Sequence, residues 1–265
     1  MDSRPQIPGQ GGNGQIRPSG ASRANGALTV SRVTRRFGGL VAVEDLSFEL
    51  AENEVLGLIG PNGSGKTTMM NLISGVLMPD SGSIRLYNES ISRRPANHIA
   101  RLGIARTFQI VRILPSLTVL ENVAAGGVFG HDRRWGHDLE EHARLMLERV
   151  GLEEAKRTPV SALTYIDQKR MELARALAAN PRVLLLDEWL AGLNPTELLT
   201  GIQLIRELKD EGRTIIVVEH VMDAIRSLCD RCVVMNSGVK IAEGTTGEVL
   251  ADPAVVRAYL GDEHV

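Results

Sequence analysis

Unbroken apolar runs are the clearest pattern in the chain, and they predict buried strands at residues 55–59, 183–186 and 214–218. Strands that are covered on both faces of a parallel sheet have this composition. Shorter or alternating apolar patterns predict further strands at residues 28–30, 42–43, 46–50, 83–87, 233–235 and 239–242. We therefore expect an α/β fold with a mostly parallel core sheet and a small antiparallel β layer packed on it.

From about residue 92 to residue 179 the pattern changes to helical spacing. Apolar residues recur every three or four positions between Leu139 and Val150, and Gly151 supplies a stop signal. A second helix is predicted over residues 169–179. Because this block separates two predicted core strands, we interpret it as an inserted α-helical subdomain. The expected organisation is one folded domain, residues 28–265, with its core in residues 28–91 and 181–265 and the helical subdomain in residues 92–180.

The two ends of the chain differ in character. Residues 1–27 are rich in Gly, Pro, Ser and Arg, so we expect a disordered N-terminal tail. Its arginines are also compatible with a functional basic arm, although a flexible extension is the simpler interpretation. Further along, Asn194, Pro195 and Glu197 have the spacing of a helix start with a capping box. A short helix is expected around residues 255–260.

Composition narrows the possible functions. The 265-residue chain has a net charge of −2 and only 3% aromatic residues, so we expect no nucleic-acid partner. No apolar run approaches the ~20 residues of a membrane span, so work at a membrane would require a partner protein. Cys229 and Cys232 form a lone C-x-x-C motif without a further ligand pair for zinc. A redox role stays open, but the strand that follows favours two small buried side chains in a reducing compartment.

The strongest chemical signal lies between the strand at residues 55–59 and a helical apolar stripe at residues 69–77. The residues between them, which we expect to bind a nucleoside triphosphate, are Gly60, Pro61, Asn62, Gly63, Ser64, Gly65, Lys66, Thr67 and Thr68. A strand, a glycine-rich loop and a helix in this order form a phosphate-binding P-loop. Loop N–H groups surround the phosphates, Lys66 reaches the β- and γ-phosphates, and the Thr67 hydroxyl is placed to bind Mg²⁺.

Two acidic residues follow the strand at residues 183–186. Asp187 and Glu188 lie at the carboxyl end of a parallel strand, where ligands bind. Beside a P-loop, Asp187 is expected to hold the Mg²⁺ shell and Glu188 to accept a proton from an attacking water. His220 follows the next strand and is either a γ-phosphate sensor or an ordinary surface residue. Phe37, in a turn, is either a ring that stacks on a base or a packing residue.

Together, the P-loop, the helical insert, the acidic strand end and His220 resemble the ATP-binding subunit of an ABC transporter, over nearly the whole chain from Leu28. Local stretches are similar to subunits of branched-chain amino-acid importers, namely residues 37–40, 105–109, 117–123, 191–195 and 240–244. The resemblance implies that Phe37 stacks on adenine and that His220 is the switch histidine. It also implies that Gln109 contacts Mg²⁺ and the attacking water.

Two motifs depart from the pattern of that family. The signature, which completes the nucleotide site of the opposite subunit, usually reads Leu-Ser-Gly-Gly-Gln and is here Leu163, Thr164, Tyr165, Ile166 and Asp167. The side chains that replace its glycines are expected to obstruct close approach to a γ-phosphate. The D-loop is Ala191, Gly192, Leu193 and Asn194, with Asn194 where aspartate is usual. Trp189, where proline commonly follows the acidic pair, is interpreted as a packing residue.

The resemblance implies an ATPase subunit that powers import of branched-chain or related amino acids and uses ATP and Mg²⁺. Its partners would be a second ATP-binding subunit (a copy of this chain or a paralogue), integral-membrane permease subunits and, indirectly, a solute-binding protein. The expected location is the cytoplasmic face of the cell membrane. Two alternatives stay open at this point: an ATP-gated binding module with little hydrolysis, and a soluble ABC ATPase outside transport.

Overall fold

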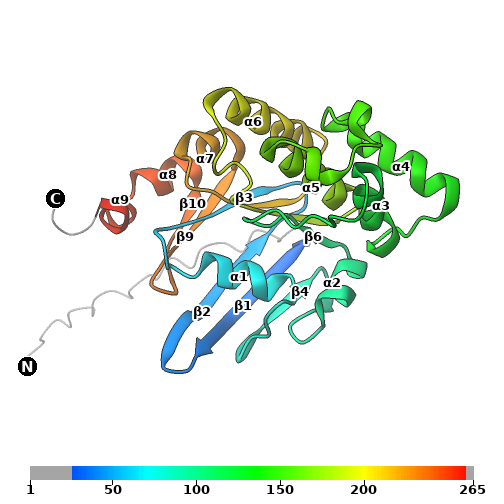
Figure 1. Cartoon of the computed structure of the whole chain (residues 1–265). Helices are drawn as coiled ribbons and strands as arrows, with labels where there is room; N and C mark the ends of the chain where they lie inside the picture. Colours follow the sequence, from blue (N-terminus) through cyan, green and yellow to red (C-terminus); the bar gives the residue numbers. More distant parts are fainter. Residues whose placement is uncertain (1–25, 261–265) are drawn as a thin grey trace, which may run out of the picture.

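The computed structural model describes residues 26–260, and Figure 1 shows their arrangement. Within these residues one sheet has six strands and another has four, and helices cover the larger sheet. The expected α/β fold, with a mostly parallel core, an antiparallel layer and a helical insert, is confirmed. Of the tail predicted over residues 1–27, residues 1–25 lie outside the described part of the chain, whereas Ala27 is fully buried beside the first strand.

The six-stranded core sheet has the order β10-β9-β3-β8-β7-β6. Its strands are β10 (Val239–Thr245), β9 (Arg231–Asn236), β3 (Val55–Ile59), β8 (Ile215–Val218), β7 (Val183–Asp187) and β6 (Ile104–Arg106). All neighbours are parallel except β9 and β10. Every residue of β3, β7 and β8 is buried, which explains why these strands are unbroken apolar runs.

The four-stranded layer is antiparallel and has the order β2-β1-β4-β5. Its strands are β2 (Leu40–Leu50), β1 (Leu28–Phe37), β4 (Ser81–Leu86) and β5 (Glu89–Ser90). The strands predicted separately at residues 42–43 and 46–50 are one strand, β2, in which Asp45 has a φ of 47°. The pairing of β1 with β2 is irregular there, so a bulge interrupts the sequence pattern without ending the strand.

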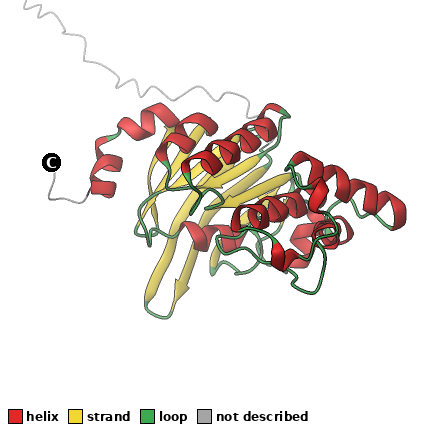
Figure 2. Ribbon diagram, turned by 45° about the horizontal axis from the view of Figure 1, so that its top comes forward, coloured by secondary structure: helices red, strands yellow, loops and turns green. Residues whose placement is uncertain are grey.

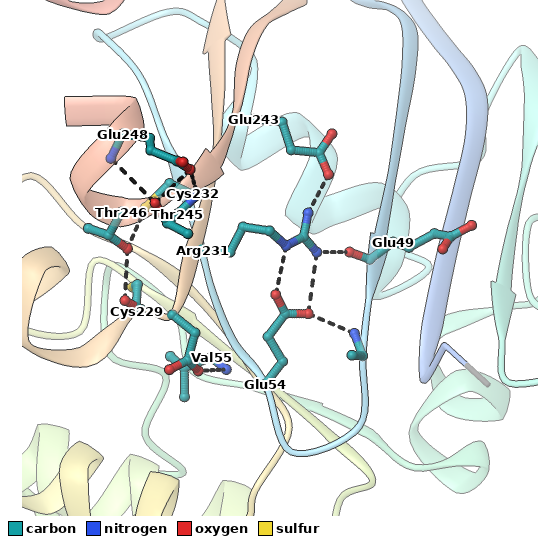
Figure 3. Close-up of polar contacts among 12 residues, drawn as sticks. Glu49, Glu54, Val55, Cys229, Arg231, Cys232, Glu243, Thr245, Thr246 and Glu248 are labelled. Atoms are coloured by element: carbon teal, nitrogen blue, oxygen red, sulfur yellow. Dashed lines mark hydrogen bonds and ion pairs between the residues drawn. The ribbon is translucent and has the colours of Figure 1, made fainter. Parts of the chain in front are cut away.

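The side chain of Arg231, on β9, joins the core sheet to the β layer (Figure 3). Its Nε lies 2.8 Å from Oε1 of Glu54, and its Nη2 donates to the backbone carbonyl of Glu49 on β2. Cys229 and Cys232 lie beside this network, and both are buried with free thiols. The expectation of two small buried side chains is therefore confirmed.

Helices pack on both faces of the core sheet. α1 (Lys66–Ile73) shares one hydrophobic cluster with the β layer and with one face of the core strands. The cluster on the opposite face includes α5 (Tyr165–Ala178), α6 (Pro195–Asp210) and α7 (Met222–Leu228). The stripe predicted over residues 69–77 is too long, because α1 ends at Ile73 and Val76 is 53% exposed.

A helical lobe projects to one side of the core (Figure 2). Besides α5, it consists of α3 (Val119–Phe129), α4 (Gly136–Arg149) and the 3₁₀ turns η1 (Glu153–Ala155) and η2 (Val160–Ala162). The shorter α2 (Ala96–Leu102) packs instead through Ile99 on the hydrophobic cluster that contains α1. The range assigned to the helical subdomain, residues 92–180, also contains β6, which pairs with β7 in the core sheet. That part of the prediction is wrong, because a three-residue strand is defined by its distant partner and carries no periodic signal.

The C-terminal part of the chain adds three short helices. α7 and α8 (Thr246–Ala251) are not predicted from the sequence, whereas α9 (Pro253–Leu260) covers the helix expected near the end. The longer α6 begins as predicted, with Asn194 as its cap and Glu197 completing the capping box. In the described range, 26–260, no helix combines the length and the apolarity that a membrane crossing requires.

Candidate functional site

The P-loop lies between β3 and α1 and borders a pocket of about 460 Å³, to which residues 62–68 contribute. Two of its glycines have no room for a side chain. A Cβ atom at Gly60 would lie 2.0 Å from the carbonyl oxygen of Met235, and one at Gly65 would lie 2.4 Å from that of Ala42. Both glycines also have positive φ, 146° and 102°. The loop therefore packs directly against β9 and β2, as only glycine permits.

Lys66 is the first residue of α1, and only 5% of it is exposed. Its Nζ donates to the carbonyl oxygens of Gly60 and Pro61 at 2.8 and 2.9 Å. Burial lowers the pKa of this ammonium group, while the nearby carboxylates of Glu188 and Asp187 act in the opposite direction. The positive charge is thus held within the loop and close to both acidic residues.

Asp187 ends β7 and is almost completely buried. Its Oδ2 lies 2.6 Å from Nη2 of Arg106, whose side chain is 5% exposed. Its Oδ1 is buried and has no hydrogen-bond partner within residues 26–260. An orphaned carboxylate oxygen is costly in a protein interior, and Mg²⁺ prefers oxygen ligands of this kind. The oxygens of Asp187 and of Thr67, which borders the pocket, therefore fit a magnesium ion.

Glu188 lies one residue further, with its carboxylate between two side chains that are distant in sequence. Oε2 accepts a hydrogen bond from Nε2 of Gln109 at 2.6 Å, and Oε1 lies 3.0 Å from Nε2 of His220. Glu188 also borders the pocket together with the P-loop. The fold therefore brings the three expected catalytic residues into one group.

Phe37 lies at the end of β1 and borders the same pocket. The residue is 42% exposed, and the guanidinium carbon of Arg35 lies 4.8 Å from the ring centroid. Leu40 is a further exposed apolar residue that borders the pocket. The interpretation of Phe37 as an ordinary packing residue is therefore not supported, and its position suits a ring that stacks on a base.

The signature residues, 163–167, lie at the start of α5 and are all described, and none of them lines the pocket of the same chain. Thr164 caps the helix by accepting from the N–H of Asp167 at 3.3 Å, and its hydroxyl donates to Oδ2 of Asp167 at 2.7 Å. Tyr165 is 50% exposed. The first turn of α5 therefore carries the carboxylate of Asp167 and the exposed aromatic ring of Tyr165.

The D-loop, residues 191–194, is the last part of the segment between β7 and α6. Its Asn194 is the N-cap of α6 and exchanges two hydrogen bonds with Glu197. Trp189, just before the D-loop, is 1% exposed, and a Cβ atom at Gly201 would lie 3.1 Å from its ring atom Cζ3. The interpretation of Trp189 as a packing residue is confirmed.

Four charged residues to which we gave no role have almost fully buried side chains around this site: Arg106, Lys169, Glu172 and Glu219. A signal for two of them exists in the sequence. Lys169 and Glu172 lie on the face of α5 that also carries Leu173 and Ala176, so they are charges within an apolar stripe. Glu219 directly follows the apolar strand β8, which is a weaker indication of burial.

The strand, the glycine loop and the acidic strand end define a P-loop nucleotide-binding protein. Comparisons with known proteins narrow this class. Residues 43–191 match the family model described as ABC transporter, and residues 239–265 match that of the branched-chain amino acid ATP-binding cassette transporter. The chain belongs to the ABC transporter family.

Individual relatives agree with this assignment. LivG of Salmonella typhimurium, a high-affinity branched-chain amino acid transport ATP-binding protein, is 41% identical over 249 residues, which cover 89% of this chain and 98% of LivG. BraF of Pseudomonas aeruginosa, of the same description, is 39% identical with the same coverage. A crystal structure of an ABC transporter cassette in its ADP conformation has a TM-score of 0.81 and 31% identity, and the match covers 89% of this chain and 99% of the cassette.

Proposed function

We propose that this chain is the ATP-hydrolysing subunit of an importer for branched-chain or related amino acids. The observation that carries the proposal is the position of Glu188, which contacts Gln109 and His220 at the edge of a P-loop pocket. A carboxylate held there is placed to accept a proton from a water that attacks the γ-phosphate. The solute class rests on the descriptions of LivG and BraF, which are transport proteins for branched-chain amino acids.

In this mechanism the loop N–H groups and Lys66 bind the phosphates of ATP, and Phe37 stacks on the adenine ring. Thr67, Asp187 and Gln109 would hold Mg²⁺, which when bound neutralises charge on the phosphates. Glu188 is the general base, and its two neighbours orient its carboxylate. His220 is placed to sense whether a γ-phosphate is present.

The proposed assembly is a pair of ATP-binding subunits on the cytoplasmic face of a membrane, attached to integral-membrane permease subunits. A solute-binding protein would act on the other side. ATP closes the pair and hydrolysis reopens it, while the segment around Gln109 passes the motion to the permease. An ATP-gated module without hydrolysis is less well supported, because the base and both of its neighbours are present and in contact. A soluble ABC ATPase outside transport is less well supported because these relatives are transport proteins.

The Glu188→Gln variant tests the assignment. It keeps the size of the side chain but removes the basic carboxylate, so ATP affinity should stay within about threefold while turnover falls at least ~100-fold. Turnover and nucleotide affinity would be measured on the chain with its permease complex. Glu140→Gln, an exposed position on α4, is the matched control and should behave as wild type. Near wild-type turnover by Glu188→Gln would falsify the role of this residue.

A further inference from the structure

The turn after β7, residues 188–191, is held by a buried lysine from the neighbouring helix α5. Nζ of Lys169 donates to the carbonyl oxygens of Glu188 at 3.3 Å, of Trp189 at 2.8 Å and of Ala191 at 2.7 Å. Only 1% of Lys169 is exposed. Because an ammonium group has three donors, the whole hydrogen-bonding capacity of this side chain is directed at one turn.

Two further contacts hold the same turn. The indole Nε1 of Trp189 donates to the backbone carbonyl of Lys169 at 3.0 Å, so each of these two residues binds the other. On the other side, the carboxylate of Glu219 accepts from the N–H of Leu190 at 2.7 Å. The carbonyl groups of the turn are thus bound by a buried cation, and one of its N–H groups is bound by a buried acid.

Glu188 needs such support because its backbone lies in the left-handed region, with a φ of 49°. This conformation is unfavourable for residues other than glycine and persists only where the surroundings fix it. The N–H of Glu188 donates to the carbonyl of Val218 at 2.8 Å, and its carbonyl oxygen accepts from the N–H of Ala191 at 3.1 Å and from Nζ of Lys169 at 3.3 Å. These bonds fix the peptide groups on both sides of Glu188, and with them the direction in which its side chain leaves the backbone.

We propose that Lys169 is a positioning residue for ATP hydrolysis, which fixes the backbone of Glu188 and links it to the signature helix α5. The inference rests on the proposed function, in which Glu188 is the base. Lys169 lies only two residues beyond the signature, and the ring of Tyr165 lies 5.2 Å from its Nζ. A shift of the start of α5, caused by the opposite subunit, therefore reaches Glu188 through this ammonium group.

Packing alone does not account for a lysine at this position. Burial lowers the pKa of Lys169, which means that its charged form is costly there. An unbranched apolar side chain such as methionine would fill the same space without that cost. What only a donor group supplies is the set of bonds to three carbonyl oxygens.

The Lys169→Met variant tests the proposal, with Lys209→Met as its matched control. Lys209 is also a helix lysine that donates to a backbone carbonyl, that of Leu228 at 2.9 Å, but it lies on α6 and does not contact the turn at residues 188–191. Both variants would be compared with wild type in the complex with the permease. For Lys169→Met we expect kcat to fall about 10–100-fold with ATP affinity within about threefold, whereas Lys209→Met should keep the wild-type kcat.

Two further readouts separate positioning from a general structural effect. Hydrogen exchange of the amides in residues 188–193, measured on the purified chain without nucleotide, should be faster in Lys169→Met and unchanged in Lys209→Met. Lys169→Arg should restore most of the activity, because its guanidinium can donate to the same carbonyl oxygens. If Lys169→Met does not fold, Lys169→Gln takes its place, since its shorter side chain keeps a polar end but has only two donor hydrogens and cannot bind three carbonyl oxygens.

The outcomes distinguish this proposal from the assignment of Glu188. An unchanged kcat, or unchanged exchange in residues 188–193, would overturn the positioning role of Lys169 and leave the proposed function intact. An unchanged kcat in Lys169→Gln would do the same where Lys169→Met cannot be used. Faster exchange in Lys169→Met, together with a wild-type chain that does not hydrolyse ATP in its complex, would instead overturn the proposed function.

Discussion

At the residue scale, the site depends on charged groups that the fold has removed from water. Glu172 is an example outside the turn after β7. Its carboxylate accepts from the N–H groups of Phe108 at 3.2 Å and Arg112 at 3.0 Å, on either side of Gln109. Burial raises the pKa of Glu172, and these two bonds together with Arg175 oppose the rise. A buried acid therefore shapes the segment that presents Gln109 to Glu188.

The buried carboxyl group of Glu219 predicts how the stability of the fold depends on pH. Burial raises the pKa of its carboxyl from 4.5 to about 7, against the opposing effects of the Leu190 N–H and of Lys169, and the charge of Glu188 raises it further. The folded chain therefore binds this proton more tightly than the unfolded chain does. Its carboxyl destabilises the fold increasingly as the pH rises from 4.5 to about 7, and this cost disappears below 4.5.

The Glu219→Gln variant removes this titration but keeps an oxygen that can accept from Leu190. Relative to wild type, the variant should gain stability between pH 4.5 and 7, by at most about 3 kcal/mol at pH 8. Denaturant unfolding at several pH values measures the difference. Glu140→Gln, which is exposed, should show no such trend. A difference between Glu219→Gln and wild type that is independent of pH would contradict the predicted pKa.

At the scale of elements, the D-loop and α6 share one residue. Asn194 accepts from the N–H of Glu197 at 3.0 Å, and its own N–H donates to Oε2 of Glu197 at 2.9 Å. Asn194→Ala should lower the free energy of unfolding by about 1 kcal/mol, because the cap is lost. Asn194→Asp, which keeps the cap, should stay within about 0.5 kcal/mol of wild type. Denaturant unfolding measures the free energy of unfolding of both variants. If both lose the same amount, the loss of the helix cap does not explain the effect of Asn194→Ala.

The elements that could be predicted are those with a strong local signal. The buried runs of β3, β7 and β8, the P-loop and the capping box of α6 all follow from residues that are close in sequence. β6 could not be predicted, since its three residues become a strand only by pairing with β7. The bulge at Asp45 split β2 into two predicted strands for a similar reason, because a bulge is a property of the pair of strands.

The same distinction applies to the candidate site. The sequence pointed to Lys66, Asp187 and Glu188 because each follows a recognisable strand or loop. It could not show that Arg106 is the buried partner of Asp187, since the two residues are far apart in sequence and meet on neighbouring strands. The sequence predicts only that Lys169 belongs to a helix, and the fold shows that its side chain points to the turn after β7 rather than to solvent.

At the scale of the whole molecule, the start of α5 bears on which partner completes the nucleotide site. In the proposed assembly, this helix end would lie against the γ-phosphate bound by the opposite subunit. Here the carboxylate of Asp167 already occupies the first turn, where a helix favours negative charge, and it would repel a phosphate. Ile166 adds a side chain where the family usually has glycine. We therefore expect this chain to close poorly on a second copy of itself.

Sizing of the Glu188→Gln variant with and without Mg-ATP tests this expectation. Alone, it should remain monomeric with ATP, because its signature does not complete the partner site. Adding Ile166→Gly and Asp167→Gln to the same variant should produce an ATP-dependent dimer. Its apparent dimer affinity should be at least ~10-fold higher than that of the Glu188→Gln chain with the unchanged signature. If the Glu188→Gln chain forms ATP-dependent homodimers without these two changes, its signature is functional as it stands.

The contacts of Leu190 and Trp189 with Gly201 have a consequence for related sequences. A Cβ atom at residue 201 would lie 2.6 Å from Cδ2 of Leu190 and 3.1 Å from Cζ3 of Trp189, so both side chains crowd the place where a side chain at residue 201 would start. A smaller residue at position 189 alone leaves Leu190 in the way, so position 201 depends on the pair of residues that follows the acidic strand end. Among homologues, a residue larger than glycine at position 201 should therefore occur together with a change at position 190, and a change at position 201 alone should be rare.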